Sequence, residues 1–277
     1  MTPPFRARGL AAAAVSLALL APACGATRGV TLPSGAGAPF PAFAAAYGEA
    51  TAECRIVRTM TVRLGVSGRA GTTRLRGRID AGLAAPAQIR LEGFPPLNFG
   101  AKPFFVMVAR GNEATLLLPR DERVLRGSPP AAIVDALAGV PLGPAELRAV
   151  LTGCGLISGD ASAGRLYPNG WGALDVAGDT TVFLRQIEGR WRVAAARRAA
   201  LTVHYADFTS GRAATVRVWT GSADGSAGAA ELTLKMSDVE IDVPLESAVF
   251  DLAVPRDAIP LTLEELRRAG PLGGGSE

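Results

Sequence analysis

Cysteine and histidine are the side chains of this sequence with the widest chemical range, and there are few of them. The 277 residues include three cysteines, Cys24, Cys54 and Cys154, and one histidine, His204. No two of these four residues have the close spacing, such as C-x-x-C, that is typical of zinc ligands. The sequence therefore predicts no metal site, and nothing in it indicates a cofactor.

The first cysteine ends a segment with the pattern of an export signal. Arg6 and Arg8 precede an uncharged apolar run from Gly9 to Leu20, and small residues follow. A positive start, a short apolar centre and a small-residue end are the parts of a secretory signal peptide. The run is too short to cross a bilayer, which takes about 20 apolar residues. We therefore expect residues 1–23 to be a signal peptide.

Two processing sites are compatible with the end of this signal. Ala23-Cys24 resembles the site of a bacterial lipoprotein signal, in which the cysteine becomes the acylated N-terminus and carries palmitate. Ala21-Pro22-Ala23 also matches an ordinary A-x-A cleavage site, which would leave Cys24 as an unmodified thiol. Gly25 follows the cysteine where the resemblance would place aspartate for inner-membrane retention. This favours an outer-membrane lipoprotein that faces the periplasm and is held by its lipid anchor.

Cys54 and Cys154 remain as a pair. Exported proteins fold in an oxidising compartment, where disulfides form and persist. A disulfide between them would close a loop of about 100 residues, which chain-entropy arithmetic values at no more than about 5 kcal/mol. The alternative is two buried free thiols. We expect the disulfide.

The sequence contains no recognisable arrangement of catalytic residues. Ser67 lacks the glycine spacing of a nucleophile elbow. His204 is out of phase with Val203 and Tyr205, which predicts an exposed position in a strand. The glycine-rich residues 153–159 come after a predicted helix and not after a strand, and their glycines do not have the spacing of a dinucleotide-binding motif. We therefore expect no enzymatic activity.

The charge of the chain is close to balanced. It has 29 lysines and arginines against 25 acidic residues, a formal net charge of +4. The basic residues are spread along the sequence and not collected in a run. This distribution is not the basic footprint of a nucleic-acid-binding protein, so nucleic acid is not an expected partner.

Apolar and polar residues alternate along much of the chain. The pattern is clear over residues 58–67 and 231–236, and it continues over 239–243 and 250–254. Period-two alternation is typical of antiparallel strands with one buried face. Counting such segments between Gly and Pro turns predicts about 11 to 12 strands.

Helical spacing appears at four places. It covers residues 42–53, a pair of segments within 129–139 and 144–153, and a short segment from Thr262 that begins with a capping box to Glu265. A sheet with this many strands must curl to bury its apolar face. We therefore predict an α+β fold, with a large curled antiparallel sheet (a half-open barrel) whose concave face is covered by helices.

Composition divides the exported chain into three parts. Residues 24–41 are rich in Gly, Pro, Ala and Ser, which is typical of a flexible tether. Residues 42–270 hold all the periodic segments and form a single predicted domain. Residues 271–277 follow the last helix and are a predicted disordered tail.

This pattern resembles the lipoprotein-localisation carrier superfamily, the LolA/LolB-like proteins. The resemblance rests on Cys24, a first helix that ends near Cys54, the strand series 58–91, the helical pair 129–153 and the closing segment 249–255. Members are half-open antiparallel barrels whose concave apolar face is covered by helices and accepts acyl chains. The resemblance spans most of residues 42–270, is architectural and includes no specific motif.

The resemblance implies a protein that binds lipid or lipoprotein acyl chains and moves them toward the outer membrane. The apolar run Phe104–Val108 is then either one wall of the cavity or a central strand beneath helices. The predicted lining residues are Leu64, Leu91, Phe104, Val106, Ile133 and Leu137. The alternative is a structural or assembly lipoprotein of the envelope, with a filled core, whose apolar loop 94–99 and exposed arginines bind a protein partner.

Overall fold

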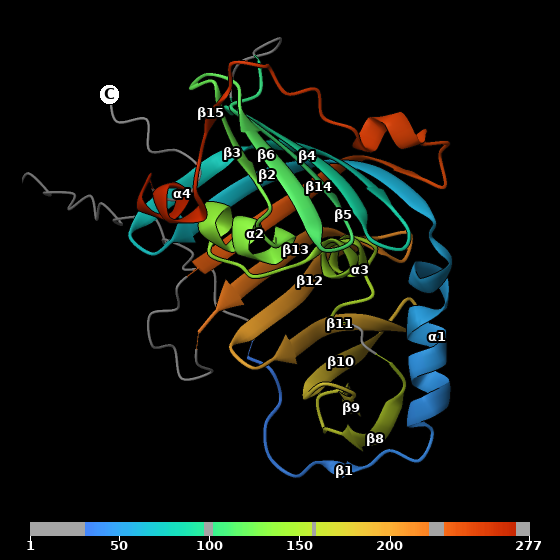
Figure 1. Ribbon diagram of the computed structural model, residues 1–277. Coiled ribbons are helices and arrows are strands. Elements are labelled where there is room, and N and C mark those ends of the chain that lie inside the picture. The colour runs from blue at the N-terminus through green and yellow to red at the C-terminus, as the bar shows by residue number, and fades with distance from the viewer. Residues whose placement is uncertain (1–30, 97–101, 157–158, 222–229, 270–277) are drawn as a thin grey trace, which may run out of the picture. The chain divides into compact units, whose positions relative to one another are not determined.

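Figure 1 shows the computed structural model, which describes residues 31–96, 102–156, 159–221 and 230–269. The chain divides into two compact units, Met1–Thr31 and Leu32–Glu277, and every helix and strand given below belongs to the second unit. The predicted signal peptide, Cys24 and the predicted tail all lie outside the described residues.

The fifteen strands formed by the described residues belong to one open sheet. Their order is β1-β8-β9-β10-β11-β12-β13-β14-β2-β3-β4-β5-β6-β7-β15, so the two strand series of the chain join where β14 pairs with β2. All pairs are antiparallel except β15 with β7. The strands are β1 (Ala38–Pro39), β2 (Thr59–Ala70), β3 (Thr73–Ala84), β4 (Gln88–Phe94), β5 (Phe105–Arg110), β6 (Glu113–Leu118), β7 (Arg123–Arg126), β8 (Ala161–Leu166), β9 (Trp171–Val176), β10 (Thr180–Ile187), β11 (Arg190–Arg198), β12 (Leu201–Thr209), β13 (Arg212–Thr220), β14 (Ala230–Ile241) and β15 (Ile259–Pro260).

The helices begin and end where the sequence gives local reasons. Pro130 opens α2, and Gly139 ends it in the left-handed conformation with φ of 70°. At α3 the backbone N–H of Gly143 donates to Glu146, and at α4 Thr262 and Glu265 form the predicted capping box. The helices are α1 (Phe43–Ile56), α2 (Pro130–Ala138), α3 (Pro144–Leu151) and α4 (Leu263–Ala269), with a 3₁₀ turn η1 (Ser247–Phe250). No helix in the described ranges combines the length and apolar character needed to cross a bilayer.

The apolar residues of the strands form two clusters on the face of the sheet that α2 and α3 cover (Figure 1). The first joins β2–β7 to α2 and includes Ile133, which is fully buried. The second joins β9–β14 to α1 and α3. Leu147, Leu234 and Met236 pack against both. We call this face the inner face and the opposite one the outer face. The α+β prediction of a curled sheet covered by helices is confirmed.

The structure has more strands than the predicted 11 to 12, and it differs near the C-terminus. Residues 239–243, predicted as a separate strand, mostly continue β14, which has a register shift between Ser237 and Glu240. Residues 250–254 are not a strand. Phe250 is 2% exposed and packs with Ala84 and Val108 on the outer face, so this segment buries its apolar residues by lying across the sheet and not by pairing with it.

The predicted tether extends too far toward the domain. Ala38 pairs with Leu166 of β8, and Phe40 is 6% exposed, with its ring 5.4 Å from that of Trp191. Burial of one phenylalanine side chain stabilises a fold by about 1.5–3 kcal/mol. The sheet and core therefore include residues 38–40 of the predicted tether.

Candidate functional site

Five of the six predicted lining residues gather in the inner cluster of β2–β7. Leu64, Leu91, Ile133 and Leu137 are buried there, and the half-buried Phe104 packs against them. They contact one another as a packed core. None of them lines the pocket described below.

Val106 has the opposite orientation. Phe105 and Met107 belong to the inner cluster, whereas the cross-strand partners of Val106 are Glu92 and Leu117. Successive side chains of a strand point to opposite faces, so Val106 lies on the outer face and not in a cavity wall. The apolar run is a central strand with both faces covered, which was one of its two interpretations.

A partly enclosed hollow among the described residues lies where β11 and β12 separate. These two strands pair only between residues 195–198 and 201–204. Beyond His204 they diverge, and a pocket of about 200 Å³ occupies the opening. The ends of α1 and α3 close it on one side, and β2 and β14 contribute to its wall.

The lining of this pocket is mainly apolar. Val239 is 39% exposed and lies in this lining, and Ile56, next to lining residue Val57, is 72% exposed. Large exposed apolar side chains beside an apolar hollow are a feature of ligand-binding grooves. The apolar lining residues are Ala50, Val57, Met60, Leu151, Val193, Phe208, Ala213, Ala214, Met236, Val239 and Ile241.

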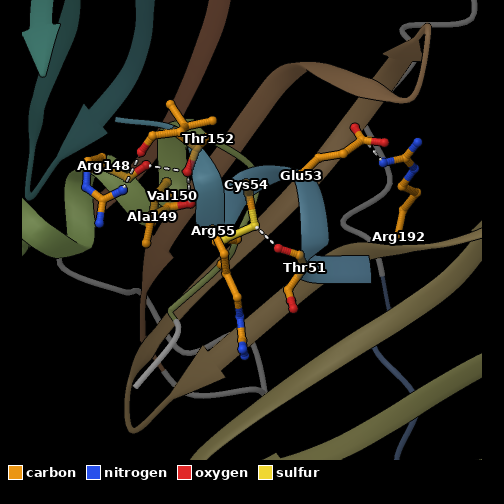
Figure 2. The surroundings of a disulfide bond; sticks show 12 residues. Thr51, Glu53, Cys54, Arg55, Arg148, Ala149, Val150, Thr152 and Arg192 are labelled. Atoms are coloured by element: carbon orange, nitrogen blue, oxygen red, sulfur yellow. Dashed lines mark hydrogen bonds and ion pairs between the residues drawn. A yellow bond between two sulfur atoms is a disulfide. The ribbon is translucent and has the colours of Figure 1, made fainter. Parts of the chain in front are cut away.

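Charged side chains form one wall. Arg192 Nη1 lies 3.0 Å from Glu53 Oε2 (Figure 2). Arg190 Nη1 lies 3.3 Å from Glu53 Oε1. The hydrogen bond from Arg192, with the nearby charges of Arg190 and Arg212, lowers the pKa of Glu53. Arg212 also lines the pocket and makes no ion pair with any residue of the described ranges. The wall therefore combines an ionised carboxylate with a surplus of positive charge.

Gly211 lies directly beside the guanidinium of Arg192. A Cβ atom built on Gly211 would clash with Arg192 Nη2, so a larger residue at this position would force the guanidinium to move. The side chain of Arg192 is 12% exposed, so its guanidinium is held between α1 and the β12–β13 turn.

The disulfide between Cys54 and Cys154 fixes the helical side of the pocket. The two Cα atoms are 5.5 Å apart, and the bond ties the end of α1 to the segment after α3 (Figure 2). Arg148 Nη1 donates to the backbone oxygen of Val57 at 3.1 Å, which joins α3 to the start of β2. Cys54 and Val57 both line the pocket.

Tyr205 holds the same region from the sheet. Its hydroxyl donates to the backbone oxygen of Val150 at 2.8 Å and accepts from the N–H of Gly155 at 3.0 Å. The side chain is 2% exposed, and burial raises the pKa of Tyr205 well above its usual range. The end of α3 is thus bonded to β12 at the pocket.

Two further sequence predictions concern His204, which does not line this pocket, and metal ligands. His204 was predicted to be exposed and is 8% exposed; burial and the charges of Arg217 and Arg185 lower its pKa to about 4. The prediction was wrong because alternation assigns a side chain to one face of a strand. It does not show whether neighbouring side chains bury that face, as they do at His204. Within the described residues no His, Cys, Asp and Glu side chains cluster as metal ligands would.

The loop proposed for a protein partner is only partly described. Phe94 is 8% exposed, and the Arg78 guanidinium lies 4.4 Å from its ring centre. Residues 97–99 of that loop lie outside the described ranges.

Comparisons with known proteins agree at the level of the fold. No family model and no curated protein match this sequence. A LolA superfamily protein from Nitrosomonas europaea is similar at 12% identity over 75% of this chain and 97% of its own, with a TM-score of 0.50. A DUF1329 family protein from Desulfovibrio piger has 12% identity over 75% and 96% of the two chains (TM-score 0.48), and lipoprotein LppX from Mycobacterium tuberculosis has 12% over 74% and 98% (TM-score 0.32). The similarity to the Nitrosomonas europaea protein shows that this chain has a LolA-like fold.

Proposed function

We propose that this protein is a non-catalytic binding protein of the bacterial envelope that takes a lipid acyl chain into the pocket between β11 and β12. The observation that carries the proposal is the apolar lining of that pocket, which reaches the surface at Val239. Ligand pockets commonly measure about 300–1,000 Å³. A volume of about 200 Å³ therefore suits one segment of a single chain and excludes a whole multi-chain lipid without further opening.

The pocket offers more room to a ligand than the core around the predicted lining residues does. Leu64, Leu91, Ile133 and Leu137 are 0–8% exposed and fill the space beneath α2. A chain could enter there only if α2 left the sheet, which would expose those four side chains to water. Entry between β11 and β12 needs no such step, because the strands are already separated.

A fluorescent single-chain fatty acid tests this assignment. The substitution Ala213→Phe places an aromatic ring in the pocket, and we expect it to weaken probe binding at least tenfold because the ring occupies the volume that the chain needs. Ala200→Phe makes the same chemical change at an exposed turn outside the pocket lining and serves as the matched control. Equal affinity of the two variants, both folded, would exclude this pocket as the binding site.

The membrane anchor is a separate part of the proposal. We propose that Cys24 is acylated and holds the domain at the outer membrane, facing the periplasm, where it receives or delivers acyl chains. The intact mass of the protein from a bacterial host should show a diacylglyceryl cysteine that Cys24→Ser removes. An N-terminus at unmodified Cys24 would replace the anchored form with a periplasmic one and would leave the pocket proposal standing.

A further inference from the structure

The outer face of the sheet carries a group of basic residues that the pocket does not use. They come from four consecutive strands of the sheet, β13, β14, β2 and β3. In the sequence β2 and β3 lie far from β13 and β14, so the two pairs of strands come together only in the folded protein. We call these residues the basic face: Arg69, Arg74, Arg76, Arg78, Arg217 and Lys235.

The strand register places these side chains together. Arg217 lies opposite Thr233, Thr233 opposite Ser67, and Ser67 opposite Arg76, which forms one row across four strands. The row two residues away runs from Lys235 through Gly65 to Arg78, and the row on the other side from Glu231 through Arg69 to Arg74. Residues two apart in a strand share a face, so the three rows lie side by side.

The intervening residues of the same strands point the other way. Leu75, Leu232 and Val218 are buried in the inner clusters, which fixes the basic residues on the outer face. Arg69, Arg74, Arg76 and Lys235 are exposed. Between them stand Gly65, Ser67 and Thr233, whose small side chains leave the charged groups as the most prominent features of the face.

The positive charge of the basic face is only partly neutralised. Glu231 lies 3.7 Å from Arg69, and Asp80 lies 3.4 Å from Arg78. Arg74, Arg76, Arg217 and Lys235 make no ion pair with the residues that the structure describes. Away from this face, many arginines have carboxylate partners: Arg110 with Asp251, Arg123 with Glu265, Arg165 with Asp175 and Arg198 with Glu146. A chain with a small net charge therefore has a local surplus of cations.

We propose that the basic face docks on the surface of a bilayer that contains anionic phospholipids. Adjacent strands lie about 4.8 Å apart, so the four strands present cations across roughly 15 Å without a groove that would select a single small anion. Trp219 is half-buried on the same face, opposite Glu231, and tryptophan is enriched at the level of lipid headgroups. A continuous anionic plane matches this arrangement better than a narrow ligand does.

Neighbouring surfaces give the docking a direction. The C-terminal segment covers the outer face farther along, where Arg90 Nη1 donates to the backbone oxygen of Val249. Next to it, Asp80, Glu92, Asp238 and Glu240 line an open groove together with Arg63 and Arg90. An anionic surface would be repelled from that acidic groove and attracted to the basic face, so one side of the outer face approaches the bilayer. This inference does not depend on the acyl-chain pocket.

Vesicle co-sedimentation tests the docking directly. The exported protein would carry Cys24→Ser so that no acyl anchor contributes. We expect it to bind vesicles of mixed phosphatidylglycerol and phosphatidylcholine and not to bind vesicles of phosphatidylcholine alone. High salt should release the bound protein, because salt screens the attraction between surface charges. Each basic residue near an anionic membrane contributes about fivefold to partitioning, so Arg74→Gln, Arg76→Gln and Lys235→Gln together should reduce it on the order of 100-fold.

The control variant changes the same number of charges elsewhere. Arg120, Arg126 and Arg256 are exposed and lie outside the basic face, and their joint change to Gln should leave most of the binding. Equal losses in the two triple variants, or binding to both kinds of vesicle alike, would overturn the proposal. So would binding to a soluble acidic polymer without any binding to vesicles. Circular dichroism would verify that both variants fold.

Discussion

At the scale of single residues, the hydroxyl of Tyr205 is the contact that links the sheet to the end of α3. Tyr205→Phe removes a buried hydrogen-bond partner from both Val150 and Gly155 while keeping the ring. Leaving buried backbone groups unpaired costs about 1–3 kcal/mol. We expect urea denaturation to show a loss of this size, whereas Tyr167→Phe, whose bond to Gly35 is exposed, should cost much less. If Tyr205→Phe lowers the free energy of unfolding no more than Tyr167→Phe does, the hydrogen bonds of Tyr205 do not stabilise the fold.

His204 gives a prediction about pH. Its pKa is lowered from 6.5 to about 4 by burial first, then by Arg217 and Arg185, while Asp207 acts in the opposite direction. The unfolded chain therefore binds a proton below about pH 6.5 that the folded chain accepts only near pH 4. The free energy of unfolding should fall as the pH drops through this window, by at most about 1.4 kcal/mol per pH unit. His204→Gln should flatten the slope; an unchanged slope would contradict the burial of this histidine.

The candidate site was predictable only in part at this scale. Cys54 and Cys154 could be paired because the sequence shows an export signal and leaves two cysteines once Cys24 is assigned to that signal. Val193, Phe208 and Ala213 could not be recognised, because they line a pocket that exists only where two paired strands separate. Alternation predicts which side chains face the core, and it does not show where the core leaves a space.

At the scale of elements, the disulfide joins α1 to the segment after α3 across 100 residues of sequence. Cys54→Ser with Cys154→Ser should reduce the free energy of unfolding by about 2–5 kcal/mol. The measurement is chemical denaturation with and without a reductant. The reductant should lower the free energy of unfolding of the wild type and leave that of the double variant unchanged. Cys24→Ser is the matched control and should have no effect. A reductant-insensitive wild type would show that the bridge adds no stability.

Element prediction succeeded where local chemistry and burial agree. Residues 58–67 became most of β2, and the capping box at Thr262 and Glu265 begins α4. It failed for residues 250–254, because alternating apolar residues can also cover the outside of a sheet, as Phe250 and Leu252 do. The two-residue strands β1 and β15 have no periodicity to detect.

At the scale of the molecule, one curled sheet supports two separate proposed functions. The opening between β11 and β12 gives an apolar pocket, and the pairing of β14 with β2 assembles the basic face. The curled sheet with covering helices followed from strand length and number, but the strand order did not. Both sites depend on that order, which is why neither pocket nor basic face was visible in the sequence.

The acyl-chain pocket is the central claim, and native mass spectrometry of the protein purified from a bacterial envelope tests it most directly. We predict a species with one non-covalently bound single-chain lipid, which is retained in Ala200→Phe and lost in Ala213→Phe. Spectra that show only free protein, even after incubation with excess fatty acid, would contradict the account. So would equal occupancy of the two variants.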